Sequence, residues 1–311
     1  MSVIRNISVI GGGYVGQGLA IQFARGGYQV SVYNRTKESS SLAMERVQFF
    51  LDLFEKNGLY SNKQAEDALS LIQPTTNLEE AARSADYVME SVSEDLSLKQ
   101  DIFMKLDALC PPHVILASDT SGLRLSEIGI KANRKDKLIV VHHYTPTPLR
   151  PVVEIVRGAE TSEETFQVTK KLLEDIDKDV VLVKEALGHI GVRISTAVRR
   201  EAMYMLERGI ASPEDIDKVA YNFGILPVFA GMDASGLDVF MNIHSYLQKD
   251  LDNRDTPSPL LKEKVDKGEL GIKSGQGFFD WDEESVKKAT DKRIKTLIMR
   301  MKEREIFQDP D

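Results

Sequence analysis

Short apolar runs recur through the first 185 or so residues of this chain, and amphipathic stretches separate several of them. Runs of about four to eight residues rich in valine and isoleucine are typical of buried strands, because a parallel sheet is covered on both faces. Residues 98–109 and 163–176 instead repeat apolar positions at helical spacing. The predicted strands are residues 4–10, 29–33, 85–92, 113–120, 137–144, 151–158 and 179–185. This alternation predicts one doubly wound α/β sheet.

The pattern changes in the carboxy-terminal part, where β-branched runs vanish and helical spacing takes over. Residues 188–209 and 212–224 are predicted helices, and the second begins with Ser212 as N-cap and Pro213 at the first helical position. A charged amphipathic stretch over residues 282–306 predicts a last, solvent-exposed helix. The carboxy-terminal part is therefore predicted to be all α.

These patterns predict two domains. Residues 1–186 form the α/β domain, and residues 187–311 form a helical domain for substrate binding and dimerisation. Residues 36–72 carry two helical patterns split near Asn57 and Gly58, which is more than a crossover between parallel strands needs. We expect a helical insertion there. A cleft between the two domains is the natural place for an active site.

Composition narrows the class of partner. The 311 residues carry a formal net charge of −8 without any lysine- or arginine-rich block, which argues against nucleic acid or an anionic membrane as partner. We find no run of about 18 apolar residues and no signal-peptide pattern, so we expect a cytoplasmic protein with a small-molecule substrate. Cys110, the one cysteine, precedes two prolines and is predicted to be an inert packing residue. We expect no metal ion.

A glycine motif connects the first predicted strand to the first predicted helix. Gly11, Gly13 and Gly16 form G-x-G-x-x-G, which provides a tight turn, a close approach to a pyrophosphate and free helix amides for the anion. The alternative of ordinary loop glycines is disfavoured, because the motif follows a strand and opens a helix. The sequence thus predicts a Rossmann-type dinucleotide-binding domain, with Tyr14 and Val15 also at the cofactor.

The end of the second predicted strand bears on the choice of cofactor. The acidic residue that usually binds the adenosine ribose is absent, and the sequence there is VYNRT, with Asn34 and Arg35. Without a carboxylate to repel a 2′-phosphate, and with an arginine to pair with it, NADP becomes a candidate. Alternatively, Asn34 hydrogen-bonds the ribose of NAD while Arg35 stacks on adenine or points to solvent. Both residues are predicted cofactor contacts.

Two adjacent histidines, His142 and His143, lie near the end of the predicted strand at residues 137–144, and Glu154 follows His142 by twelve positions. Successive side chains of a strand face opposite sides, so we expect only one of the two histidines to point into a site. Glu154 can return beside it and hydrogen-bond a ring nitrogen, which fixes the tautomer that a general base needs. The alternative is a structural histidine.

The chain resembles the 3-hydroxyacyl-CoA dehydrogenase family, including relatives that act on small 3-hydroxy acids such as gulonate and carnitine. The family pattern of His, two bulky residues, Asn-Pro and a Glu twelve positions after the His is similar to HHYTP…E here. The resemblance implies that His142 is the base and Glu154 its partner, and that His143, at a normally aromatic position, is incidental. It also implies that Ser121, twenty-one residues before His142, contacts substrate and the cofactor region.

Two further segments carry the resemblance. ADYVMESVSEDLSLK, residues 85–99, is similar to the cofactor-binding strand and loop of the family, which implies that Glu94 and Lys99 lie near the nicotinamide ribose and the pyrophosphate. KSGQGFFDW, residues 273–281, is similar to the usual closing motif. The family mostly uses NAD, which we therefore expect as the cofactor, with NADP as the alternative. It also associates through its helical part, which implies a homodimer.

Several positions depart from the family pattern. Thr145, counted among the cofactor contacts, stands where the family has asparagine, and Val192 in GHIGVR replaces the active-site asparagine of G-F-I-x-N-R. The segment LPVFAG lacks the usual glutamate. The helical insertion holds few lysines to meet the phosphates of coenzyme A. The substrate side thus differs from an ordinary fatty acyl-CoA enzyme, and the acyl group, CoA-linked or a free acid, stays open.

The favoured interpretation is a nicotinamide-dependent oxidoreductase that belongs to fatty acid metabolism. Hydride passes from C3 of a 3-hydroxyacyl substrate to the nicotinamide, His142 takes the hydroxyl proton, Glu154 stabilises the imidazolium and Ser121 orients the oxygen. A second interpretation is a 6-phosphogluconate or 3-hydroxyisobutyrate type of dehydrogenase, but GHIGVRIS lacks the catalytic lysine of that type. A third is a crystallin-like dinucleotide-binding protein with weak or no activity, which Val192 suggests. The joint presence of the three catalytic candidates argues against it.

Overall fold

The structure of the chain is a computed structural model that describes residues 4–225 and 227–306, with the side chains of 303–306 left aside. Two compact units are present, residues 1–251 and 252–311. The helices that follow residue 187 therefore begin in the same compact unit as the sheet. The predicted domain boundary between residues 186 and 187 stays a prediction.

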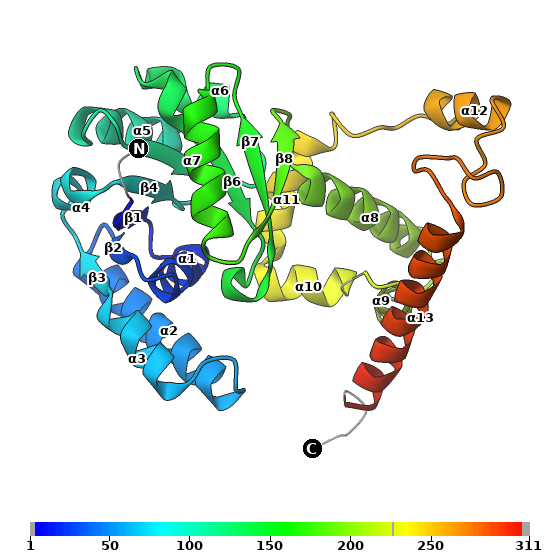
Figure 1. Cartoon of the computed structure of the whole chain (residues 1–311), viewed down its shortest axis with the longest axis horizontal. Coiled ribbons are helices and arrows are strands. Elements are labelled where there is room, and N and C mark those ends of the chain that lie inside the picture. The colour runs from blue at the N-terminus through cyan, green and yellow to red at the C-terminus, as the bar shows by residue number, and fades with distance from the viewer. Residues whose placement is uncertain (1–3, 226, 307–311) are drawn as a thin grey trace. The chain divides into compact units, whose positions relative to one another are not determined.

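An eight-stranded sheet forms the centre of the first unit, as Figure 1 shows. The strand order is β3-β2-β1-β4-β5-β6-β7-β8, and neighbouring strands are parallel except β6 and β7. The doubly wound sheet predicted from the sequence is confirmed. The strands are β1 (Asn6–Ile10), β2 (Gln29–Tyr33), β3 (Ile72–Thr75), β4 (Tyr87–Glu90), β5 (Ile115–Ser118), β6 (Leu138–His143), β7 (Val152–Arg157) and β8 (Asp179–Lys184).

Helices cover both faces of this sheet, because alternate residues of its strands supply two separate apolar cores. On β4, for example, Tyr87 and Met89 face one core while Val88 faces the other. The first core packs under α1, α2, α3 and α7, and the second under α4, α5 and α6. The bounds are α1 (Tyr14–Arg25), α2 (Lys37–Lys56), α3 (Asn62–Ser70), α4 (Leu78–Ser84), α5 (Leu96–Leu109), α6 (Leu125–Ile128) and α7 (Glu163–Glu174).

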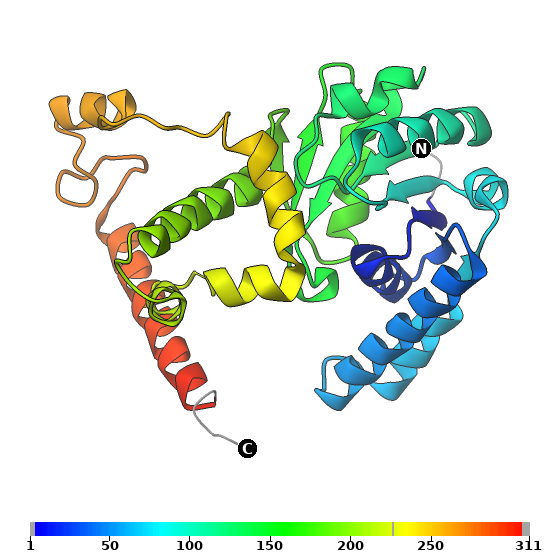
Figure 2. The same ribbon diagram turned by 180° about the vertical axis from the view of Figure 1, so that it is seen from behind.

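The carboxy-terminal part is helical, as predicted. The first unit continues through α8 (Ile190–Glu207), α9 (Pro213–Asn222), α10 (Val228–Ser235) and α11 (Leu237–Leu247), and the second unit contains α12 (Pro259–Asp266) and α13 (Glu283–Ile306) (Figure 2). Ser212 caps α9 by accepting a hydrogen bond from the backbone of Asp215, and Pro213 begins the helix. No helix in the described part of the chain is long and apolar enough to cross a membrane.

The predicted insertion is a helical hairpin of α2 and α3, split at Asn57 and Gly58. Cys110 is buried, which raises the pKa of its thiol to about 11 and agrees with the predicted packing role. The sequence analysis missed β3, a four-residue edge strand that follows the hairpin. Of the sheet, β1 is the strand that matters most for function, because β2 and β4 lie on either side of it and the strand order reverses there. Such a switch point forms a crevice at the carboxyl ends of the strands.

Candidate active site

The glycine loop after β1 opens this crevice. Gly11 has a φ of +106°, and a Cβ there would meet the carbonyl oxygen of Ser91 at 2.6 Å. A Cβ on Gly16 would meet the carbonyl oxygen of Gly11 at 1.8 Å, so the start of α1 packs directly on the loop. Gly13 caps α1 and has no atom within 4 Å of where its Cβ would be, which leaves room for a ligand over the first helical turn. This cradle fits the pyrophosphate of NAD.

The residues expected at the adenosine ribose follow β2. The side-chain oxygen of Asn34 accepts a hydrogen bond from the backbone N–H of Gly12 at 3.1 Å, so the amide ties the end of β2 to the glycine loop. Its NH2 group is buried without a partner among the described residues and can donate to a ligand. Arg35 is exposed. Tyr14 is also exposed and packs edge-on against Phe50.

A buried ion pair supports the loop after β4. The ammonium of Lys99 lies 2.7 Å from a carboxylate oxygen of Glu90 and 3.4 Å from Glu94, and Lys99 is almost fully buried. Glu94 accepts hydrogen bonds from the hydroxyl of Thr120 at 2.6 Å and from the backbone N–H of Ser121 at 3.0 Å. The chain of contacts therefore joins the loops after β4 and β5 and positions Ser121 at the crevice.

His142 and Glu154 face each other across the antiparallel pair of β6 and β7. Nδ1 of His142 lies 2.7 Å from Oε2 of Glu154, and both side chains are buried. Oε1 of Glu154 accepts the backbone N–H of Gly191 at 3.3 Å. Burial alone would raise the pKa of the Glu154 carboxyl, but the hydrogen bond and charge of His142, with the hydroxyl of Tyr144 and the Gly191 amide, lower it below its usual range. The pair is built to keep a carboxylate beside the imidazole.

Aromatic rings enclose the His142 imidazole. Tyr144 lies edge-on at a centroid distance of 5.1 Å, and His189 lies at 5.3 Å. A ring nitrogen of His189 pairs with the carbonyl oxygen of Thr120 at 3.1 Å, while burial and then the charge of His142 lower the pKa of His189 to about 4. His189 is thus neutral near pH 7. The sequence analysis missed this ring, although it directly precedes α8.

His143 also borders the crevice. Its backbone N–H donates to a carboxylate oxygen of Asp119 at 2.8 Å, and its Nδ1 lies 3.1 Å from the same oxygen. The alternation argument predicted that only one of the two histidines would face the site, but both contribute to its lining. His143 is the last residue of β6 and still pairs with Val153, and the cavity at this end of the strand is bordered by both histidines. Asp119 is a second buried carboxylate that the sequence analysis missed.

A cavity of about 600 Å³ in the first unit is lined by some of these residues. Ser121, His142, Thr145 and Val192 contribute to its wall, as does Val15 from the start of α1. Val192 is buried against Leu247 and Leu251 and presents no hydrogen-bonding group in its side chain. The other wall residues are Asp119, His143, Tyr144, Arg150, Pro151, Val152, Gly191, Ser195, Arg199, Ser235, Val239, Phe240 and Ile243.

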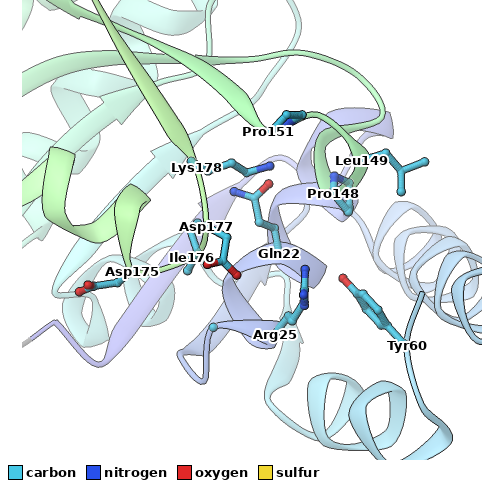
Figure 3. Close-up of a pocket in the computed structure, with 11 residues that line it drawn as sticks. Gln22, Arg25, Tyr60, Pro148, Leu149, Pro151, Asp175, Ile176, Asp177 and Lys178 are labelled. Carbon is cyan, nitrogen blue, oxygen red and sulfur yellow. The ribbon is translucent and has the colours of Figure 1, made fainter. Parts of the chain in front are cut away.

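A separate cavity of about 340 Å³ lies beside α1 and the turn before β8 (Figure 3). Gln22, Asp177 and Lys178 turn toward it, whereas Asp175 points away. The ammonium of Lys178 donates to the backbone carbonyl oxygens of Thr147 at 2.8 Å and Arg150 at 2.6 Å. Burial, and then the charge of Arg25, lower the pKa of Lys178 to about 8. Lys178 thereby holds the segment between β6 and β7 that borders the 600 Å³ cavity.

Comparison with known proteins identifies the family. A model described as the NAD binding domain of 3-hydroxyacyl-CoA dehydrogenase matches residues 6–186, and the carboxy-terminal domain model of the same enzyme matches residues 188–281. The chain belongs to this family. The predicted family and NAD-binding domain are thus confirmed, and the chain is an NAD-dependent oxidoreductase of the 3-hydroxyacyl-CoA dehydrogenase type.

Three relatives within the family are informative. A 5-formyl-3-hydroxy-2-methylpyridine 4-carboxylate 5-dehydrogenase of Mesorhizobium japonicum is 32% identical, over 95% of this chain and 97% of its own. A probable 3-hydroxybutyryl-CoA dehydrogenase of Bacillus subtilis is 35% identical, over 91% and 99%. The crystal structure of (S)-3-hydroxybutyryl-CoA dehydrogenase from Ralstonia eutropha has a TM-score of 0.73 with 26% identity, over 90% and 100%. Members of the 3-hydroxyacyl-CoA dehydrogenase family with different named substrates thus resemble this chain to similar degrees.

Proposed function

We propose that this protein interconverts a 3-hydroxyacyl substrate and its 3-oxo form, with His142 and Glu154 as the catalytic pair. The observation that carries the proposal is the 2.7 Å contact between the buried Glu154 carboxylate and the imidazole of His142, which lines the 600 Å³ cavity. A carboxylate that orients an imidazole and stabilises its protonated form is what a general base of this kind requires.

The chain's own residues supply the proton transfer. His142 accepts the C3 hydroxyl proton at Nε2, because Nδ1 is engaged with Glu154. Bound NAD⁺ supplies the acceptor for the hydride that leaves C3 as the C–O bond becomes a carbonyl. Glu154 stabilises the imidazolium that forms, and the reverse reaction returns the same proton. Ser121 orients the substrate oxygen, since it lines the same cavity.

Some residues of the crevice contact the cofactor directly, and others hold these residues in place. Gly11, Gly13 and Gly16 approach the pyrophosphate with Tyr14 and Val15 beside them, and Asn34 and Arg35 serve the adenosine end. Lys99 acts as a positioning residue, because its ammonium is engaged with Glu90 and Glu94. Glu94 holds the backbone of Ser121. Thr145, exposed at the cavity wall, contacts the nicotinamide end.

Two alternatives receive less support. A dehydrogenase of the 6-phosphogluconate type needs a lysine at the start of the helix that α8 represents, and α8 contains no lysine. A crystallin-like binding protein has no need of Ser121 and His142 at one cavity, with Glu154 paired to His142. Within the dehydrogenase reading, Val192 favours a substrate other than a fatty acyl-CoA. The Mesorhizobium japonicum relative is named for a pyridine carboxylate, which supports a small free acid as a second substrate class for this protein.

We further propose that the protein is a cytoplasmic homodimer that serves fatty acid or related acid metabolism. Large apolar side chains are exposed on the helices after the sheet, which supports association through this region. They include Ile194, Val219, Phe223, Leu237 and Met241.

Dehydrogenase assays test the proposed function. The purified protein is given 3-hydroxyacyl-CoA esters of several chain lengths and free 3-hydroxy acids, each with NAD⁺ and NADP⁺. We expect NAD⁺-dependent turnover of at least one substrate, and a fall of about 10²–10⁴-fold in His142→Ala. NADH binding should survive in that variant, because His142 lies outside the glycine cradle. Full activity of His142→Ala would contradict the proposal.

A further inference from the structure

Arg199 brings a positive charge to the wall of the 600 Å³ cavity. It belongs to α8, where its guanidinium donates to the hydroxyl of Ser195 at 2.9 Å and stacks over the ring of Phe240 at 4.3 Å from the centroid. Ser195 and Phe240 line the same cavity. The stacked ring holds the guanidinium plane and leaves N–H groups at its edge.

The charge of Arg199 has no carboxylate partner among the described residues. Other arginines of the first unit do: Arg134 pairs with Asp107, Arg157 with Glu163 and Arg193 with Asp250. The Arg199 guanidinium is partly removed from water without a compensating anion, and this burial lowers its pKa. A cation held in this way at a cavity wall is suited to an anionic group of a ligand.

The position of Arg199 on α8 is close in sequence to the helix turn that contacts Glu154. Gly191, which donates to Glu154, lies one helical turn before Ser195, a rise of about 6 Å. Long side chains of a helix point toward its N-terminus, and the hydrogen bond to Ser195 agrees with that direction for Arg199. A free 3-hydroxy acid has one methylene between its hydroxyl-bearing carbon and its carboxylate, so its charge lies close to the reacting C3, and His142 and Arg199 line the same cavity.

We propose that Arg199, with Ser195, binds the carboxylate of a free 3-hydroxy acid while His142 takes the proton of its C3 hydroxyl. This inference rests on the proposed dehydrogenase function and names its substrate class. A coenzyme A thioester has no charge on the reacting acyl group, and its pantetheine arm carries the phosphates far from C3. The guanidinium therefore selects the free acid over the thioester.

Steady-state kinetics test the subsite with 3-hydroxybutyrate, its uncharged methyl ester and 3-hydroxybutyryl-CoA. Arg199→Met removes the charge and keeps an apolar stem, and Arg199→Lys keeps a charge without the forked geometry. Arg208→Met is the matched control, because Arg208 stacks on Tyr204 at the end of α8 but is exposed outside the cavity. In Arg199→Met we expect kcat/KM for the acid to fall about ten- to hundredfold, the scale of a charge-assisted hydrogen bond. Most of the loss should be in KM, with partial rescue in Arg199→Lys.

Values for the ester and the thioester should stay within about twofold in Arg199→Met, and Arg208→Met should match wild type throughout. Equal losses for acid and ester, or a wild type that turns over only the thioester, would overturn the subsite while the dehydrogenase function stands. Calorimetric titration of acetoacetate with NAD⁺ present gives a second readout that needs no turnover. Binding that weakens in Arg199→Met but not in Arg208→Met supports the subsite even if every substrate of the panel fails, and equal binding in the three proteins rejects it.

Discussion

Replacing Glu154 by glutamine is the sharpest test of the catalytic pair, because it keeps the shape of the side chain and removes its charge. Each oxygen of Glu154 accepts a hydrogen bond or pairs with a ring nitrogen: Oε1 meets the Gly191 N–H and Oε2 meets Nδ1 of His142. A glutamine must turn its NH2 group toward one of them. If the NH2 group faces Gly191, it meets the backbone N–H of Gly191, and two donors oppose each other. If the NH2 group faces His142, it donates to Nδ1 and the ring proton stays on Nε2. Nε2 then cannot accept the proton of the substrate hydroxyl.

The magnitude follows from the lost charge. Opposite unit charges about 4 Å apart attract by about 4 kcal/mol at an effective dielectric constant near 20. The buried contact of 2.7 Å between His142 and Glu154 justifies that dielectric in place of the value for water. Since each ~1.36 kcal/mol is a factor of ten in rate, Glu154→Gln should lower kcat by about a thousandfold. The wrong tautomer would add to this loss.

The assay is steady-state NADH formation with the best substrate of the panel, together with NADH binding followed by fluorescence. The chain offers its own control, since Asp119 pairs with His143 at the same cavity. Asp119→Asn keeps an oxygen acceptor and should lower kcat by less than about tenfold, whereas NADH binding should be unchanged in Glu154→Gln. A kcat above one tenth of wild type in Glu154→Gln, or a larger loss in Asp119→Asn, would refute the assignment of His142 as the base.

Three further predictions address stability, cofactor and assembly. Burial lowers the folded-state pKa of Lys178 from 10.5 to about 8, so between these pH values the unfolded chain binds one more proton than the folded chain. The unfolding free energy of wild type minus that of Lys178→Met should therefore rise by up to about 3 kcal/mol from pH 8 to 10.5. Denaturant titrations measure this difference, and a value that does not change with pH would contradict the prediction. Arg35→Ala should leave NAD⁺ affinity within about twofold, and it should weaken NADP⁺ binding about tenfold or more only if the exposed guanidinium pairs with the 2′-phosphate. Light scattering should give about twice the monomer mass, and Phe223→Glu should shift the protein toward monomer, because Phe223, the C-cap residue of α9, is 75% exposed. A monomeric wild type at micromolar concentration would exclude the dimer.

Most of the fold could be predicted because the spacing of apolar residues along the chain indicates which residues are buried. The strand runs are apolar on both faces, and the caps of α9 at Ser212 and Pro213 are local features. Strand β3 escaped because only Ile72 of its four residues is buried and Pro74 is unusual in a strand. Its place at the sheet edge comes from pairing with β2, which is a long-range property.

The candidate site divides along the same line. The pairing of His142 with Glu154 could be expected, because a strand that returns after a short connection brings residues twelve apart face to face. The contact of His143 with Asp119 joins residues twenty-four apart, and it depends on the parallel pairing of β6 with β5, which ends one residue before Asp119. Sequence alternation alone therefore assigned His143 no partner.

Arg199 occupies a position in the structure that its helical pattern does not indicate. On an amphipathic helix an arginine one turn after a serine is expected on the solvated face, where its charge is cheap. In α8 the wall made with α11 half-buries that face, since Phe240 stacks beneath the guanidinium. The same helix has Val192 where the family pattern has asparagine, and Arg199 lies about two turns further along α8. Under the proposed subsite, a substrate that is held by charge at Arg199 has less need of an amide at position 192, so the departure at Val192 fits the same substrate specificity.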